Sequence, residues 1–170
     1  MCIRDRDVTF VSHKGVFVTK LPPDEIREAY NIIAILEGYA AELAALYTSE
    51  KEVKKLRQYQ KELKKLAREK KYHDYAETNY AFHRYITTLS HNKTLANTIS
   101  TLRARVYTYR FISVTIPGYL EKYASEHEHI IDAIEKKDSS RARDYMKKHV
   151  DFVNDILVSF LKEHNHLNDL

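Results

Sequence analysis

From residue 22 almost to the end of the chain, apolar residues recur at intervals of three and four, the period of one helix face. Short polar segments and N-terminal signals, such as the capping-box pair Ser49 and Glu52, divide this pattern into successive helices. The pattern predicts helices over about residues 24–47, 49–67, 75–89, 94–115, 119–136 and from 139 into the C-terminal tail. We therefore expect an all-α fold, a bundle of about six helices.

Residues 8–19, VTFVSHKGVFVT, follow a different pattern, rich in β-branched and aromatic residues around a central Ser-His-Lys-Gly. This pattern predicts a short β-hairpin that turns near Gly15. Since an isolated hairpin is not stable in water, we expect it to pack on other structure. Residues 1–7 have no periodicity, and we interpret them as a non-native scar or a disordered segment.

Composition agrees with one soluble helical domain. The chain has 170 residues, of which 44% are hydrophobic and 31% charged, and only 3 Gly and 3 Pro interrupt helices. The net charge of +4 is mild, and Lys and Arg alternate with Glu and Asp as on a solvated helix face, which disfavours a nucleic-acid site. A single cysteine, Cys2, excludes an internal disulfide and a thiolate metal cluster. No apolar run suggests a membrane span or signal peptide, so we expect an intracellular, cytoplasmic protein.

Polar residues in the predicted buried stripes are the first candidates for function. In residues 75–89, Asn79 and His83 lie one turn apart in line with apolar residues. In the predicted helix over residues 119–136, His127 falls in the buried row, whereas His129 falls on the polar side. His149 belongs to the apolar stripe of the last helix. Three different helices are therefore predicted to send one imidazole each into the same core.

These residues can hold a metal ion. Neutral imidazole is a common transition-metal ligand, and helical bundles assemble such sites from facing helices. We predict a buried metal bound by His83, His127 and His149, with Asn79 as a fourth ligand through its carbonyl oxygen. The alternative is three separately hydrogen-bonded core histidines, and spacing alone leaves both interpretations open.

Charged residues near the same stripes are candidates for binding an effector. Arg103 and Arg105 flank the inward stripe of the fourth predicted helix, where they could clamp a carboxylate. The alternative, which we favour for each arginine taken singly, is a surface residue lying along the bundle. Glu37 lies inside the first stripe, either as a pocket residue or as the partner of an interior cation, because ionised Glu is seldom buried alone.

The order of three motifs along these helices resembles a known family. They are N-x-x-F-H from Asn79 to His83, E-H-x-x-I-x-D-A-I from Glu126 to Ile134, and M-x-x-H from Met146 to His149. Together they resemble the FCD ligand-binding domain of GntR-family bacterial transcription regulators. The segment LPPDEIREAYNIIAILEGYAAELAA resembles the first helix of that domain, and VSHKGVFVTKL resembles the wing hairpin before it. The resemblance covers about residues 8–155.

The resemblance implies an antiparallel bundle with a central cavity over residues 21–170, preceded by a wing remnant over residues 8–20. In this family the cavity often holds a divalent metal bound by an acidic residue and three histidines, which correspond here to His83, His127 and His149. We expect zinc, with nickel or manganese as alternatives. Asn79 stands where many relatives have Asp, and loss of that charge should weaken metal binding.

The resemblance also implies a function. Such regulators read operator DNA as dimers through an N-terminal winged helix-turn-helix, while the FCD domain senses a small metabolite, commonly a carboxylate or sugar acid. The recognition helix would precede residue 8, so we expect a homodimeric sensor that binds operator DNA only within a full-length protein. A metalloenzyme and a structural helical interaction module are the alternatives. We expect no enzyme activity, since the sequence shows no well-placed general base beside the metal ligands and Glu37 is the only inward acid identified.

Overall fold

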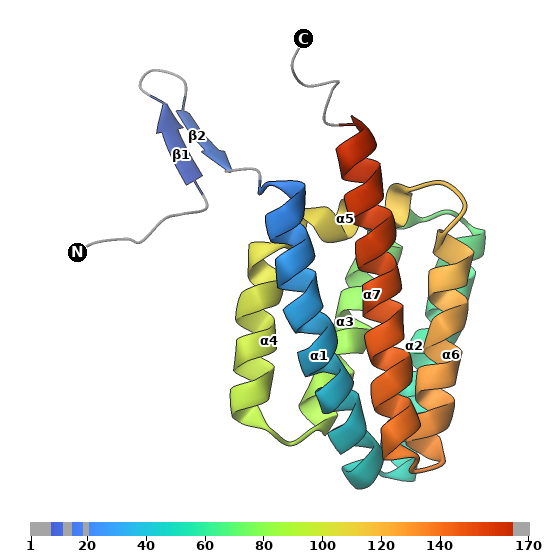
Figure 1. Ribbon diagram of the computed structural model, residues 1–170. Coiled ribbons are helices and arrows are strands. Elements are labelled where there is room, and N and C mark those ends of the chain that lie inside the picture. Colours follow the sequence, from blue (N-terminus) through green and yellow to red (C-terminus); the bar gives the residue numbers. More distant parts are fainter. Residues whose placement is uncertain (1–7, 12–14, 19–20, 165–170) are drawn as a thin grey trace.

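The computed structural model of the chain describes residues 8–11, 15–18 and 21–164. Seven α-helices fold within residues 21–164, which confirms the predicted all-α class (Figure 1). They are α1 (Pro23–Tyr47), α2 (Glu50–Arg68), α3 (Tyr72–Leu89), α4 (Lys93–Arg105), α5 (Tyr107–Thr115), α6 (Leu120–Glu135) and α7 (Ser139–His164).

Five of these helices form a closed ring around the core. α1 packs against α3, α3 against α2, α2 against α6, α6 against α7, and α7 returns to α1. α4 packs on both α1 and α3, and the short α5 lies against α3 and α7 across one end of the bundle (Figure 1). Long helices that follow one another through short turns run in opposite directions, so the bundle is antiparallel (Figure 1).

Local sequence explains the helix ends. The predicted capping box is present, because the Ser49 backbone N–H donates to Glu52 Oε2 at 2.8 Å at the start of α2. Asn92 caps α4 by accepting a hydrogen bond from the Leu95 backbone N–H at 3.0 Å. These caps satisfy backbone donors that a helix leaves unpaired at its first turn.

The predicted fourth helix, residues 94–115, is two helices in the structure. Val106 lies between α4 and α5 with φ −107° and ψ 18°, outside the α-helical region, and its side chain is buried. Beyond this break, Tyr109 of α5 contacts Leu21, which lies just before α1. Its hydroxyl accepts a hydrogen bond from the Leu21 backbone N–H at 2.8 Å and lies 3.3 Å from the Leu21 carbonyl oxygen. The break therefore redirects the chain across the end of the bundle.

Two short strands precede the helices. β1 (Val8–Val11) pairs antiparallel with β2 (Gly15–Val18), with Val11 opposite Gly15 at the turn end. Residues 12–14, between the strands, and residues 1–7, interpreted above as a scar or disordered segment, lie outside the described residues. The interpretation of this hairpin as the remnant of a DNA-binding wing stays a prediction.

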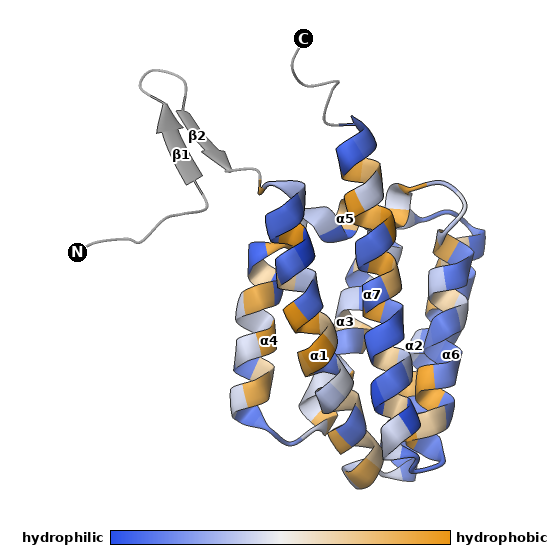
Figure 2. Ribbon diagram, viewed as in Figure 1, coloured by the Kyte–Doolittle hydropathy of each residue, from blue (hydrophilic) through white to orange (hydrophobic). Residues whose placement is uncertain are grey.

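The first helix, α1, is the most apolar element of the bundle. By length and composition it could cross a membrane. However, 56% of its apolar 18-residue stretch is buried inside the bundle, as in the core helix of a soluble protein. Gly38 lets α7 approach closely, because a Cβ there would lie 3.1 Å from the Arg143 carbonyl oxygen. Hydrophobic positions recur along α1, whereas hydrophilic positions dominate the outward turns of α7 (Figure 2).

Candidate metal and effector site

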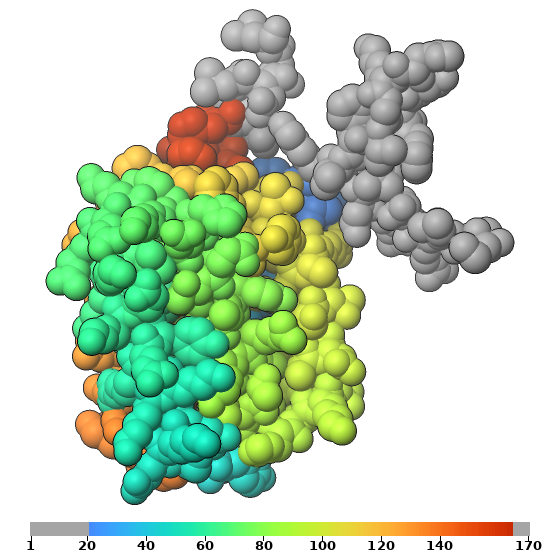
Figure 3. All heavy atoms as spheres, turned by 180° about the vertical axis from the view of Figure 1, so that it is seen from behind, coloured from blue at the N-terminus to red at the C-terminus, as the bar shows by residue number. Residues whose placement is uncertain are grey.

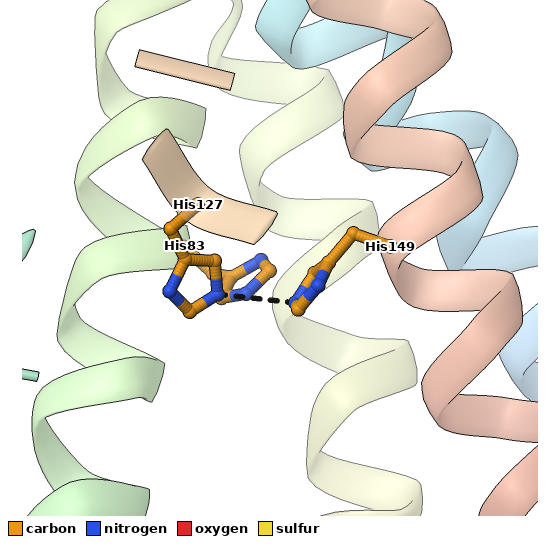
Figure 4. Close-up of side chains that lie close together, drawn as sticks. All are labelled: His83, His127 and His149. Atoms are coloured by element: carbon orange, nitrogen blue, oxygen red, sulfur yellow. Dashed lines mark hydrogen bonds between the residues drawn. The ribbon is translucent and has the colours of Figure 1, made fainter. Parts of the chain in front are cut away.

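Three histidines meet in the core of the ring. His83 of α3, His127 of α6 and His149 of α7 are all buried, and one ring nitrogen of each lies within 4.8 Å of the others. Their rings turn toward one another from three helices (Figure 4). His129 is exposed and packs against Tyr145, with ring centroids 5.5 Å apart. Helical phase therefore separated the inward histidines from the outward one correctly.

Carboxylates orient two of the three rings. Glu37 Oε2 lies 2.8 Å from His83 Nδ1, and Glu126 Oε2 lies 2.9 Å from His149 Nδ1. A carboxylate oxygen accepts hydrogen bonds, so each Nδ1 carries the proton of this contact, and Nε2 is the nitrogen left for a metal ion. Metal-binding histidines in proteins are commonly oriented in this way.

The third ring, His127, has a different environment. Its Nε2 lies 3.1 Å from His149 Nε2, and its Nδ1 is buried without a hydrogen-bond partner among the described residues. Two nitrogen ligands about 2.0–2.1 Å from one zinc ion would lie roughly 3.3 Å apart at a tetrahedral angle. The observed separation therefore suits shared coordination as well as a hydrogen bond between the rings.

Asn79 lines one cavity together with His83 and His149. It lies one turn before His83 on α3, and its Oδ1 is buried with no hydrogen-bond partner in the part of the chain that the structure describes. An unpaired buried carbonyl oxygen is costly, and a cation would satisfy it. Three imidazoles and one amide oxygen are donors that a divalent transition metal accepts, so the residues present fit such an ion.

Glu37 is fixed by a buried ion pair as well as by His83. Arg103 Nε donates to Glu37 Oε1 at 2.7 Å, and Arg103 Nη2 donates to Oε2 at 2.8 Å. Burial alone would raise the pKa of Glu37, but Arg103 and then His83 outweigh it and hold the pKa below its ordinary value. Glu37 is therefore a carboxylate, and it is the partner of an interior cation as well as a residue beside the cavity.

Burial also favours the neutral form of His83 and His127. It lowers the pKa of His83 against the opposing effect of Glu37, and it lowers the pKa of His127 well below the ordinary value, helped by the neighbouring His149 and His83. Neutral imidazole is the form that binds a metal.

Two cavities adjoin the cluster. The first, about 40 Å³, lies among α1, α3, α4, α5 and α7, and its lining includes Asn79, His83, His149 and Arg110. The second, about 360 Å³, lies between α3 and α4 and is lined by Glu37 and His83 among others. Arg103 lines both cavities. On the face opposite to that of Figure 1, a hollow separates the atoms of α3 from those of α4 (Figure 3).

Comparison with known proteins adds a family to this geometry. The FCD domain family matches residues 28–152, well over half of the chain. This chain belongs to the FCD domain family. A Bacillus subtilis (strain 168) protein described as an uncharacterized HTH-type transcriptional regulator, YdhC, is 26% identical over 141 residues, which are 79% of this chain. The chain spans 61% of the length of that relative.

Solved structures share the fold of this FCD domain. E. coli McbR/YncC superimposes with a TM-score of 0.81 at 17% identity, covering 89% of this chain and 77% of that one. A GntR-family transcriptional regulator from Pseudomonas syringae pv. tomato gives a TM-score of 0.72 at 19% identity, covering 95% and 67%. Streptococcus agalactiae GntR gives 0.66 at 16% identity, covering 87% and 74%. The homologues and structural neighbours are thus GntR-family regulators.

The FCD domain brings together most, but not all, of the residues predicted from sequence. His83, His149, Asn79, Glu37 and Arg103 line the cavities, and His127 lies against His149. Arg105, by contrast, lies on the surface and donates to Glu25 at 2.7 Å. Residues two apart on a helix differ by about 200° in direction, so Arg103 and Arg105 cannot both face the same cavity. The structure therefore does not support Arg105 as an effector-binding residue.

Sequence reasoning missed two residues of the site. Glu126 precedes His127 on the polar side of its helix, yet it reaches His149 on the neighbouring helix. Arg110 lines the first cavity from α5. The break at Val106 separates it from Arg103, so the helical spacing of the two residues gave no signal for this placement.

Proposed function

We propose that this FCD domain is the effector-sensing part of a GntR-family transcription regulator, and that it binds a small carboxylate-bearing ligand beside a divalent metal. The metal ligands in this proposal are His83, His127 and His149, with Asn79 Oδ1 as the fourth donor. The observation that carries it is the convergence of three buried imidazoles, two of them oriented by carboxylates, at a cavity that Asn79 also lines with its unpaired amide oxygen.

The charges around the cluster suit a divalent ion despite the neutral Asn79. The carboxylates of Glu37 and Glu126 contact the histidine ligands on the side away from the proposed metal ion, although Arg103 already neutralises the charge of Glu37. We expect zinc to bind best, with nickel and manganese as alternatives, and more weakly than in a site with Asp at this position. When bound, the ion would attract an oxygen atom of the ligand as a Lewis acid.

No specific observation favours either alternative, a metalloenzyme or a structural interaction module. Glu37 accepts hydrogen bonds from Arg103 through both oxygens and from His83, so it is not available as a general base for a metalloenzyme. A purely structural role would leave Asn79 Oδ1 buried without a partner, which is costly. We therefore propose a binding domain and not an enzyme.

The wider assignments follow from the family and are part of the proposal. GntR-family relatives support a regulator that binds operator DNA as a homodimer through a winged helix-turn-helix, with residues 8–20 as part of a wing and residues 21–170 as the sensor. They also support a cytoplasmic protein that does not act at a membrane.

Elemental analysis of the purified chain before and after chelation tests the metal site. We expect stoichiometric metal, and we expect its removal to lower the melting temperature, because a metal that binds only the folded state stabilises that state. Returning zinc, nickel or manganese should restore the melting temperature. Absence of metal, together with no thermal shift from any of the three ions, would refute the metal site.

A further inference from the structure

Arg110 is a partly unpaired cation on the wall of the first cavity. Its side chain is only 14% exposed, and its Nη2 contacts the carboxylate of Glu77. Its Nη1 is buried and has no hydrogen-bond partner among the described residues. Nη2 of the guanidinium therefore has a partner, whereas the N–H groups of Nη1 have none.

Two tyrosines help to hold the guanidinium in place. Its central carbon lies 3.9 Å from the ring centroid of Tyr107 and 4.9 Å from that of Tyr80. Both distances are short enough for cation–π attraction. Tyr80 and Tyr107 line the same cavity as Arg110, so the group is held in position there before any ligand binds.

Arg103, the other arginine of this cavity, is already occupied. Its Nε and Nη2 both donate to Glu37, in the paired geometry that arginine uses for a carboxylate. Glu77, the partner of Arg110, is by contrast half exposed, so solvent weakens that ion pair. Arg110 is thus the cation of the cavity whose charge is least compensated.

We propose that Arg110 receives the anionic group of the effector through Nη1. The inference rests on the proposed function, since it assigns the ligand's negative group within the same site. The cavity of about 40 Å³ that Arg110 shares with the histidines has more room than a single water molecule needs. The ligand class is therefore a small organic acid with its carboxylate on Arg110 and the rest of the molecule directed toward His83 and His149.

Titration calorimetry with acetate, succinate and citrate as probes tests this assignment. The chains compared are the wild type, Arg110→Gln, Arg110→Lys and the matched control Arg105→Gln, which removes a surface arginine outside the cavity. We expect Arg110→Gln to weaken the tightest-binding probe by about 10- to 100-fold, the range for one charged hydrogen-bonding partner. Arg110→Lys should bind with intermediate affinity because it keeps the charge but loses the planar fork. Arg105→Gln should bind like the wild type.

Equal probe affinity in the wild type and Arg110→Gln would overturn the assignment, as would failure of all three probes to bind the wild type. Arg110→Lys keeps the comparison decisive if Arg110→Gln does not fold, because unchanged affinity in a folded Lys variant would also count against it. Metal content measured on the same samples separates the two proposals. A metal-loaded wild type without an Arg110 effect refutes only this inference, whereas an Arg110 effect without metal refutes only the metal site.

Discussion

The two sides of the histidine cluster use the same pair of residue types in different surroundings. On the α1 side, His83 donates to Glu37, whose side chain is 2% exposed and is held by Arg103. On the α7 side, His149 donates to Glu126, whose side chain is 25% exposed and has no arginine partner among the described residues. Water can compensate part of the charge of Glu126, whereas Glu37 depends on Arg103 and His83. We infer that the first pair is part of the framework of the fold, while the second mainly adjusts the site.

The largest effect should come from breaking the buried side. Arg103→Ala leaves Glu37 as an uncompensated buried charge, and we expect a loss of about 3–5 kcal/mol in the free energy of unfolding. Urea denaturation of the metal-free chain measures it. The matched control Arg105→Ala removes a surface ion pair and should cost at most about 1 kcal/mol. Similar losses in the two variants would mean that the two sides do not differ as proposed.

His127 joins the two sides, and its removal should have the next largest effect. His127→Ala deletes one of three nitrogen ligands, so metal affinity should fall by more than the roughly 100-fold upper range for a supporting residue. Competition with a chelator measures the affinity, and the melting temperature should fall with the loss of metal. His129→Ala changes an exposed histidine two residues away and should do little. Equal effects of the two changes would exclude His127 as a ligand.

A smaller effect is expected from a change on the α7 side, where Glu126 is partly exposed. Glu126→Gln keeps an acceptor for His149 Nδ1 but removes the charge, so metal affinity should fall about 10- to 100-fold. The free energy of unfolding of the metal-free chain should change little, in contrast to Arg103→Ala. Glu128→Gln is the control, since Glu128 lies on the same helix as Glu126 and pairs at the surface with Lys64 of α2. If Glu126→Gln destabilises the metal-free chain as much as Arg103→Ala, Glu126 belongs to the framework as well.

Helical periodicity predicted which histidines are buried because a helix fixes the direction of every side chain relative to its neighbours. It therefore also predicted that His129 faces outward, and it singled out Glu37. It could not show that Glu37 would pair with Arg103, because that contact joins residues 66 apart in the chain. Contacts between helices depend on how the helices pack, and a single-helix pattern contains no such information.

The same limit explains the errors around the fourth predicted helix. Val106 carries no Gly or Pro signal, so nothing in the local sequence marked the break between α4 and α5. The short α5 that follows carries Arg110 to the cavity, whereas Arg105 remains at the surface. Glu126 was missed for a related reason: its partner His149 lies on α7, so neither helix alone reveals the contact.

The smallest expected effect concerns Asn79, which lines the first cavity together with one histidine of each side, His83 and His149. Asn79→Asp adds a negative charge next to the proposed ion without adding bulk, so metal affinity should rise on the order of tenfold, equivalent to about 1.4 kcal/mol. In the absence of metal the new carboxylate should destabilise the chain, because burying an unpaired charge is costly. Metal titration and urea denaturation separate these opposite effects. Asn97→Asp adds the same charge on α4 and should leave metal affinity unchanged, whereas weaker metal binding by Asn79→Asp would mean that Asn79 is not a ligand.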